Sequence, residues 1–358
     1  MTKKKKVILI ILATLVVLFV GTMWFLAAMI YDDNFDDRLE TYEPKMFRVD
    51  DFDGLSRTRY EFQSDKEQKL VGYMYKAGEG QKAIIMLAHG LGAGHNYYMD
   101  IINCFAQRGY YVFAYDATGN DESEGQGVIG LPQGVIDLDH AISFVEENND
   151  FPDLPICLFG HSWGAFSASN VLTFHPEVKA VVEVSGWNRA SDMFESEGKR
   201  QAGAFIYLMM PFVKLHEWIH FGKYSSNSAL DGFEASDAAV MVVHSEDDNV
   251  VPIEVGYDTF YEKYKDDPRF EFVRFKDKGH NYILNDSSNT YMDEFNAEWM
   301  EWLNEQGYDY NAEENQSRLA EDKANYLHEH LDRQKYAGRS DMELVEKFVE
   351  FYDKHIGR

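Results

Sequence analysis

Cysteine and basic residues are both scarce in this chain of 358 residues. Two cysteines cannot form a disulfide framework, and no Cys-x-x-Cys pair of the kind that binds zinc or exchanges thiols is present. Lysine and arginine total 34 against 61 acidic residues, which gives a formal net charge of −27. A surface this acidic repels phosphate backbones, so we expect no nucleic-acid partner. With 45% hydrophobic and 27% charged residues, the composition is that of a folded protein with a sizeable core.

Charge is also missing from one long segment near the amino terminus. Residues 7–31 carry no charged side chain, and about 20 apolar residues are enough to cross a bilayer as a helix. Because Lys3 to Lys6 precede this segment and positive flanks stay in the cytoplasm, we expect residues 1–6 to be a cytoplasmic basic segment. Residues 7–31 are then a single-pass transmembrane anchor, with the bulk of the protein outside the cytoplasm. A signal peptide cleaved near Leu26-Ala27-Ala28 stays open as the alternative.

Beyond the anchor, apolar runs of strand length alternate with helical patterns. Residues 32–68 read as a linker and entry strand, and residues 83–88 form a continuous apolar run that is typical of a strand buried on both faces. This alternation predicts an α/β fold with a mostly parallel central sheet flanked by helices. Such sheets bind ligands beyond the carboxyl ends of their strands. Further strands are predicted over residues 58–62, 70–76, 110–115, 156–159, 178–184, 238–243 and 270–275.

Two segments depart from the alternation. Within the domain predicted over residues 69–305, residues from about 187 to 236 are rich in apolar side chains and predict a helical cap insertion. Its apolar side chains either line an acyl-binding pocket or pack the cap onto the sheet. Residues 306–358 predict a charged helical tail, in which Ser340 and Glu343 have the spacing of a capping box. We expect this tail to dock on the domain rather than to bind a partner.

The most informative motif is Gly-His-Ser-Trp-Gly at residues 160–164, which follows the apolar run at residues 154–159. It is G-x-S-x-G in a strand–turn–helix context, where the serine stands clear of the backbone. A side chain at Gly160 or Gly164 would collide with the neighbouring strand or helix. The following helix directs its amino end at the serine, where negative charge develops during acyl transfer. Ser162 is therefore the candidate nucleophile.

A nucleophilic serine needs a base, and the base needs a carboxylate that fixes its tautomer. In this fold the three residues are expected in the order Ser, Asp, His along the chain. Asp248, in an acidic loop after a strand, is the candidate acid, with Asp247 in reserve, although both are open to a plain surface role. His280, which follows a glycine after the last strand, is the candidate base. The backbone N–H groups of Leu91 and Trp163 are expected to form the oxyanion hole.

These motifs give the chain from about Lys69 to Trp302 a family resemblance. It resembles the α/β-hydrolases, and most closely the serine aminopeptidase-like group that includes monoacylglycerol lipases and lysophospholipases. The resemblance implies an acyl-enzyme mechanism on esters, thioesters or, less often, amides, with no cofactor. One departure is Gly119-Asn120-Asp121, where the family usually has Gly-x-Gly after the aspartate, and the predicted cap matches nothing that names a substrate. The matching motifs are residues 89–92, 116–125, 160–164, 244–252 and 279–280.

A competing motif lies in the predicted cap, where residues 216–220 have the spacing H-E-x-x-H. On a helix, His216 and His220 would share one face that holds zinc, with Glu217 as the base. A catalytic zinc needs a third ligand, and neither Glu234 nor Asp237 stands in a recognised metalloprotease arrangement. The main hypothesis is a membrane-anchored serine hydrolase for esters, carboxylesterase- or lipase-like, without metal or cofactor. The alternatives are an aminopeptidase-like serine peptidase on the same residues, a zinc metalloprotease, and a non-catalytic surface protein.

Overall fold

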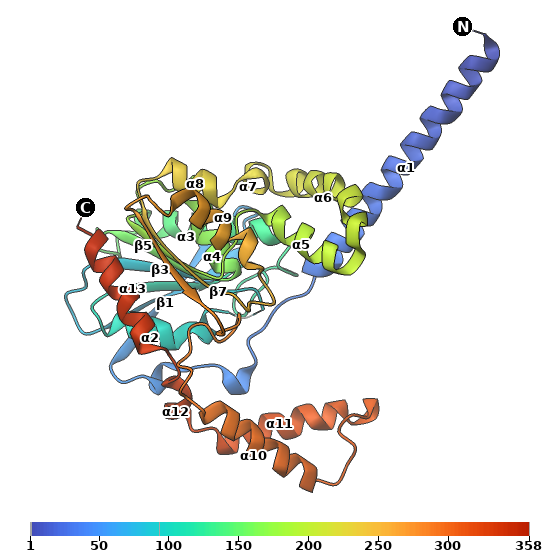
Figure 1. The fold of residues 1–358 in the computed structure, drawn as a ribbon. Helices are drawn as coiled ribbons and strands as arrows, with labels where there is room; N and C mark the ends of the chain where they lie inside the picture. The colour runs from blue at the N-terminus through green and yellow to red at the C-terminus, as the bar shows by residue number, and fades with distance from the viewer. Residues whose placement is uncertain (1, 93, 358) are drawn as a thin grey trace.

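Eight strands form one sheet in the part of the chain that the structure, a computed structural model, describes, namely residues 2–92 and 94–357 (Figure 1). They are β1 (Leu55–Gln63), β2 (Lys69–Ala77), β3 (Ile84–Ala88), β4 (Tyr111–Asp116), β5 (Ile156–His161), β6 (Ala180–Val184), β7 (Ala239–Ser245) and β8 (Phe270–Phe275). Their order across the sheet is β1-β2-β4-β3-β5-β6-β7-β8. β2 pairs antiparallel with β1 and β4, and the strands from β4 to β8 are parallel. The predicted mostly parallel sheet is confirmed.

Helices cover both faces of this sheet. Every residue of β3 and β7 is buried, which explains why residues 84–88 and 239–243 are continuous apolar runs in the sequence. Two hydrophobic cores result, one on each face. The first lies under α3 (Leu131–Glu147), α4 (Trp163–Val171), α8 (Ala229–Ala235) and α9 (Tyr257–Tyr264), and the second under α2 (Met99–Ala106) and α13 (Met342–His355). Short 3-10 turns, η3 (His95–Tyr98) and η5 (Ile253–Val255), follow β3 and β7.

The interval between β6 and β7 is helical, as the sequence predicts. It contains α5 (Ala190–Ala202), η4 (Gly203–Phe205), α6 (Ile206–Phe221) and α7 (Lys223–Ser226), followed by α8. α5 and α6 lie at the end of the molecule from which α1 (Lys3–Phe35) projects (Figure 1). The insertion therefore forms the surface on which the amino-terminal helix packs, called the seat of α1 below.

α1 consists of a packed part and a projecting part. Its buried residues, Met23, Ala27, Tyr31 and Phe35, recur every four positions and form the stripe on which α1 packs against the domain, chiefly α6. The apolar side chains from Val7 to Val20 are exposed. Among the described residues, α1 is the helix that is long and apolar enough to cross a membrane.

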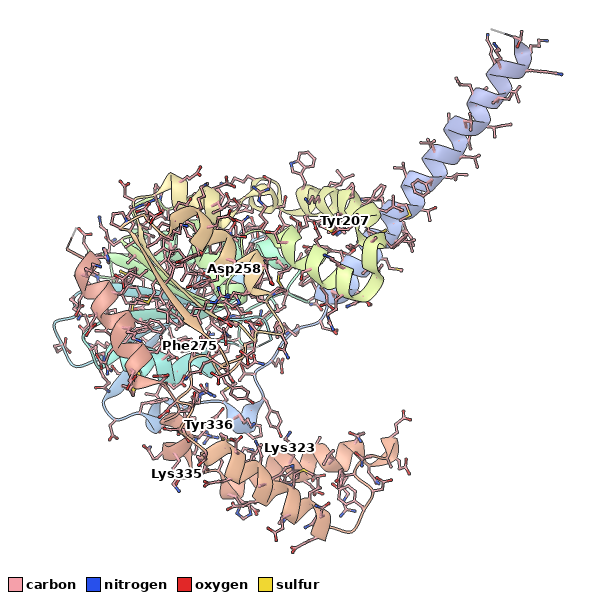
Figure 2. The ribbon with its side chains drawn as sticks, viewed as in Figure 1. Tyr207, Asp258, Phe275, Lys323, Lys335 and Tyr336 are labelled. Atoms are coloured by element: carbon pink, nitrogen blue, oxygen red, sulfur yellow. The ribbon has the colours of Figure 1, made fainter. Side chains whose placement is uncertain are left out.

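The linker after α1 meets the carboxyl-terminal helices. Its 3-10 turns are η1 (Glu43–Lys45) and η2 (Val49–Asp51), and the helices that they meet are α11 (Gln316–His330) and α12 (Arg333–Ala337), which follow α10 (Tyr291–Glu305) and η6 (Glu313–Asn315). Tyr336 of α12 stacks on Phe47 with ring centroids 4.7 Å apart. Figure 2 shows Tyr336 and Lys335 of α12 on the side of the carboxyl-terminal helices that faces the domain, and Lys323 on α11.

The last helix, α13, is a layer of the fold and packs beside α2. The Tyr352 hydroxyl donates a hydrogen bond to the Leu158 carbonyl oxygen of β5 at 2.7 Å. The predicted capping box at the start of this helix is wrong, because Asp341 is the N-cap and accepts from the backbone N–H groups of Glu343 and Leu344. The Ser340 hydroxyl is instead buried and hydrogen-bonds Asp100 at 3.2 Å.

Candidate active site

Ser162 occupies a tight turn between β5 and α4. Its backbone has φ 56° and ψ −120°, a conformation that a residue other than glycine adopts only under strain. Two glycines make the turn possible: a Cβ on Gly160 would lie 2.2 Å from the Gly164 carbonyl oxygen, and one on Gly164 would lie 1.9 Å from that of Ala88. As predicted, a side chain at either glycine would collide with the backbone of a neighbouring segment.

The structure brings Ser162, Asp248 and His280 together, although they follow three different strands. His280 Nε2 lies 2.9 Å from Ser162 Oγ, and His280 Nδ1 lies 2.7 Å from Asp248 Oδ2. A carboxylate only accepts, so Nδ1 carries the proton and Nε2 is left to accept from the serine hydroxyl. All three residues are buried. This arrangement can remove the hydroxyl proton as the serine attacks a carbonyl.

Asp248 is the acid that reaches His280, and Asp247 has a different contact. Asp248 Oδ1 accepts from the backbone N–H groups of Val250 and Val251 at 2.9 and 2.8 Å, which fixes the carboxylate. Burial opposes its charge, but hydrogen bonds from His244 and His280 outweigh that cost and hold the pKa of Asp248 well below its usual range.

Asp247 shapes the loop that carries the histidine. Its Oδ1 accepts from the Gly279 backbone N–H at 2.8 Å and from the Ser245 hydroxyl at 2.6 Å. These bonds lower the pKa of Asp247, whose carboxylate faces the segment just before His280. The two neighbouring aspartates therefore divide their contacts between the imidazole and the loop that bears it.

The loop after β3 lies directly against the start of α4. The close approach of Gly164 to Ala88 places residues 89–92 beside Ser162, and Leu91 lines the same pocket as Ser162. His89 stays within the loop: its Nδ1 donates to the Gly90 carbonyl at 2.8 Å, and its Nε2 accepts from the Ala117 N–H at 2.9 Å.

Two residues that sequence reasoning did not single out connect this loop to the His280 loop. The Gly90 N–H donates to the Tyr98 hydroxyl at 3.0 Å, and that hydroxyl lies 2.8 Å from His161 Nδ1. His161 Nε2 lies 3.1 Å from the His280 carbonyl oxygen, so Nε2 donates and Nδ1 accepts from Tyr98. Burial, then the neighbouring His280, lowers the pKa of His161 to about 3, so this bridge stays neutral. Its signal in the sequence is weak, because His161 is only the variable position before the serine.

The pocket at Ser162 has a volume of about 260 Å³ and is walled by the linker rather than by the insertion. Its described lining is Thr41, Tyr42, Lys45, Gly90, Leu91, Gly92, Tyr97, Tyr98, His161, Ser162, His280 and Asn281. The insertion's apolar side chains, which the sequence offers as the lining of an acyl-binding pocket, are absent from the described lining of the Ser162 pocket. They surround a second cavity of about 420 Å³ between α1, α5 and α6, which shares no described lining residue with the first.

The H-E-x-x-H motif lies on α6 and contacts α1. His216 Nε2 donates to Asp32 Oδ1 at 2.9 Å, and the Tyr31 hydroxyl donates to Glu217 Oε1 at 3.2 Å. The rings of His216 and His220 lie 4.3 Å apart, but neither Glu234 nor Asp237 joins them in a group within metal-binding distance among the described residues. Burial raises the pKa of Glu217 to about 8. The motif thus supplies polar contacts that seat the amino-terminal helix.

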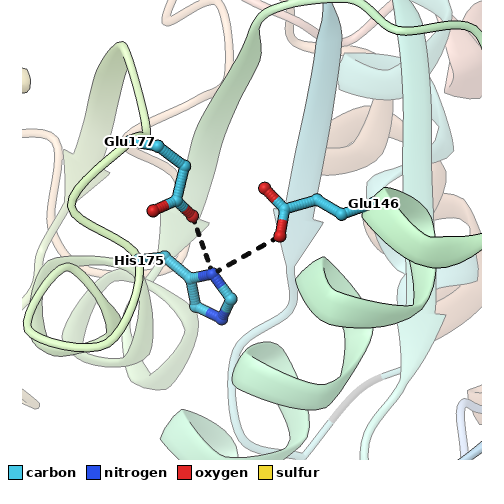
Figure 3. A group of neighbouring side chains, drawn as sticks. All are labelled: Glu146, His175 and Glu177. Atoms are coloured by element: carbon cyan, nitrogen blue, oxygen red, sulfur yellow. Dashed lines mark hydrogen bonds and ion pairs between the residues drawn. The ribbon is translucent and has the colours of Figure 1, made fainter.

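One group of side chains with metal-ligand chemistry lies elsewhere, between α3 and the segment after α4. Glu146, His175 and Glu177 have ligand atoms within 4.8 Å of one another (Figure 3). His175 Nδ1 donates to Glu177 at 2.8 Å, and its Nε2 lies 2.9 Å from Asp139. Burial opposes the charge, but these hydrogen bonds outweigh it and raise the pKa of His175. Both ring nitrogens of His175 thus face carboxylate acceptors, so these residues form a hydrogen-bonded cluster.

Comparison with known proteins finds sequence similarity to one family and to several lipases. Residues 79–231 match the protein-family model described as "Serine aminopeptidase, S33". The monoglyceride lipase of Mus musculus is 31% identical over 97 residues, 27% of this chain and 32% of that protein. That of Homo sapiens is 31% identical over 83 residues, 23% of this chain and 27% of that protein. The matches thus span about a third of the length of these relatives or less.

Among solved structures, an esterase of Pyrococcus furiosus superposes with a TM-score of 0.52 at 19% identity. The superposition covers 81% of this chain and 98% of that one. The chain therefore has the α/β-hydrolase fold. In sequence it is similar to the serine aminopeptidase and monoglyceride lipase group, as the sequence resemblance predicts.

Proposed function

We propose that the chain is a serine hydrolase that cleaves carboxylic esters through an acyl-enzyme. The observation that carries this proposal is the hydrogen-bonded series Ser162 Oγ–His280 Nε2, 2.9 Å, and His280 Nδ1–Asp248 Oδ2, 2.7 Å. The strained turn at Ser162 and the amino end of α4 behind it support the same role. The similarity to monoglyceride lipases supports an ester as the substrate.

In the proposed reaction, Ser162 Oγ attacks the ester carbonyl while His280 Nε2 takes the hydroxyl proton. The N–H groups of Leu91 and Trp163 hold the oxyanion, and Asp248 stabilises the imidazolium. His280 then gives its proton to the departing alcohol, which leaves the acyl group on Ser162. Water, deprotonated by His280, attacks the acyl carbonyl and releases the carboxylic acid, which restores the serine.

The pocket favours an ester over the aminopeptidase alternative. An enzyme that removes an amino-terminal residue must bind a protonated amine, for which a carboxylate is the ordinary partner. None of the described residues that line the Ser162 pocket is an aspartate or a glutamate, and one of them is Lys45. A cationic amine therefore has a repulsive neighbour there and no counter-charge.

The proposed enzyme is attached to a membrane by α1. Its 33 residues are long enough to cross the hydrocarbon core, and the exposed part from Val7 to Val20 has no protein partner among the described residues. Lys3 to Lys6 favour the cytoplasmic side, so the hydrolase is proposed to face away from the cytoplasm.

The test is covalent labelling with a fluorophosphonate probe, which reacts with activated serines. We expect the detergent-solubilised full chain to label, Ser162→Ala to stay unlabelled, and EDTA to change nothing. Ser167→Ala, on the buried face of α4 outside the pocket, is the matched serine control and should label like the wild type. A folded wild-type protein that remains unlabelled, or labelling that persists in Ser162→Ala, would contradict the proposal.

A further inference from the structure

A lysine without an acidic partner stands in the wall of the Ser162 pocket. Lys45, the last residue of η1, is half-buried and lines this pocket together with Ser162 and His280. Among the described residues, none of the protein's 61 acidic side chains forms a hydrogen bond or an ion pair with its ammonium group. In so acidic a protein, a solvent-shielded cation without a counter-charge is an unusual feature.

The charges around Lys45 are themselves basic. After burial, the neighbours that lower the pKa of Lys45 are Lys323 of α11 and Arg339. Glu43 is only two positions away, but it points to other partners and lies 3.0 Å from His328. Figure 2 shows Lys323 on the upper side of α11, which packs against η1. A half-buried ammonium beside like charges is destabilised until an anion joins it.

The backbone that carries Lys45 is fixed at both ends. Upstream, Asp121 accepts from the Thr41 N–H at 2.6 Å and from its hydroxyl at 2.7 Å. Downstream, Arg333 donates to the Met46 carbonyl oxygen at 2.6 Å. Asp121 is the residue at which the chain departs from the glycine usual in similar proteins. The departure thus supplies the contact that holds the linker at the pocket, which places the ammonium group before substrate arrives.

We infer that Lys45 binds an anionic group of the substrate, a carboxylate or a phosphate that lies a few bonds from the ester cleaved at Ser162. The inference rests on the proposed esterase function and names the class of ester that this pocket accepts. The linker therefore acts as a specificity element that is absent from the motifs shared with similar hydrolases.

The experiment compares matched pairs of esters with the full chain in detergent. One pair differs on the alcohol side, 1-butyrylglycerol against 1-butyrylglycerol 3-phosphate. The other differs on the acyl side, 4-nitrophenyl butyrate against the mono-4-nitrophenyl ester of glutaric acid. We expect kcat/KM to be higher for the anionic member of at least one pair. A charge-assisted contact of ordinary strength corresponds to a preference of about 10- to 100-fold, expressed mainly in KM.

Lys45→Met keeps an unbranched side chain of similar length and removes its charge. It should bring the ratio of kcat/KM for the anionic ester to kcat/KM for the neutral ester down to about one, while Lys45→Arg keeps the wild-type ratio. Lys335→Met, on α12 outside the pocket, is the matched control and should behave like the wild type. Equal hydrolysis of both members of both pairs, or an equal loss on neutral and anionic esters in Lys45→Met, would overturn the inference. Fluorophosphonate labelling and neutral-ester hydrolysis would then still report on Ser162, so the two proposals fail separately.

Discussion

Two regions of this molecule combine histidines with carboxylates, and they use them differently. At the pocket, Ser162 and His280 are 118 positions apart in the chain, and strand ends bring them to 2.9 Å. On α6, His216 and Glu217 belong to a motif whose spacing suggests zinc chemistry, yet their hydrogen bonds go to Asp32 and Tyr31 of α1. Spacing along the chain places side chains on one face of an element. The residues that those side chains contact from other elements decide whether they form a reactive site or a structural contact.

The cavities beside these regions differ in the same way. The Ser162 pocket, about 260 Å³, lies at the carboxyl ends of parallel strands and has Ser162, His280 and Lys45 in its wall. The cavity of about 420 Å³ beside α6 is lined mostly by apolar side chains of α1, α5 and α6. The larger cavity is therefore not the one with the reactive groups, and the experiments below test whether chemistry and anchoring are separate.

The largest effect is expected from Asp248→Asn. The amide can donate to His280 Nδ1, which stabilises the wrong tautomer and leaves no base for Ser162, so kcat should fall by about 10⁴-fold. Asp247→Asn is the matched control, because it changes the adjacent residue and alters only the loop contacts to Gly279 and Ser245. It should cost less than about tenfold. Initial rates on one neutral ester measure both. Equal losses in the two variants would mean that the aspartates are not divided between base and loop.

The sequence predicts that Ser162, Asp248 and His280 meet, because each of them is tied to a local signal. The turn at Ser162 needs glycines where the backbones of Gly164 and Ala88 approach. The strands are apolar because helices cover both faces, and strand order determines where Asp248 and His280 emerge. Each of these requirements constrains residues that lie close together in the sequence. Local patterns and their order along the chain therefore suffice to predict the three residues.

The linker wall could not be predicted, because its cause is long-range. Thr41 reaches the pocket through Asp121, 80 positions away, and nothing near Thr41 indicates that contact. The same holds for α6, where only the three-dimensional position of Tyr31 shows why Glu217 is buried. Ser340 has the spacing of a capping residue, but Asp100 lies within reach and takes its hydroxyl. Local patterns predict elements, whereas such partners depend on the whole fold.

A second, smaller effect should appear as a pH dependence of stability at the seat of α1. Burial raises the pKa of Glu217 to about 8, above its ordinary value of 4.5. The folded state therefore holds a proton that the unfolded state releases. The stability that this group contributes is complete below about pH 4.5 and is lost as pH rises towards 8.

Glu217→Gln should remove this dependence. Thermal unfolding in detergent should be measured at pH 5 and pH 9. The stability of the variant relative to the wild type should increase as pH rises, because only the wild type loses the contribution of Glu217, and each pKa unit corresponds to about 1.4 kcal/mol. Glu183, whose pKa burial raises to about 7, titrates in both proteins and cancels in the difference. Glu234→Gln, at an exposed position, is the matched control. A difference that does not change with pH would show that Glu217 is not buried against α1 in solution.

The smallest effect on activity is expected from the motif that looks most catalytic in isolation. His220→Ala removes one of the two imidazoles that a zinc site on α6 would need, whereas the proposed mechanism needs only Ser162, His280 and Asp248. Hydrolysis should therefore stay within about twofold of the wild type, with and without EDTA, since an exposed surface substitution rarely costs more.

His216→Ala deletes the hydrogen bond to Asp32 and should lower the unfolding temperature while leaving kcat/KM for a neutral ester unchanged. If both variants lost activity together and added zinc restored the wild type after chelation, chemistry and anchoring would share α6. If only stability responds, the two regions are separate, and the H-E-x-x-H spacing reflects the way one helix seats another.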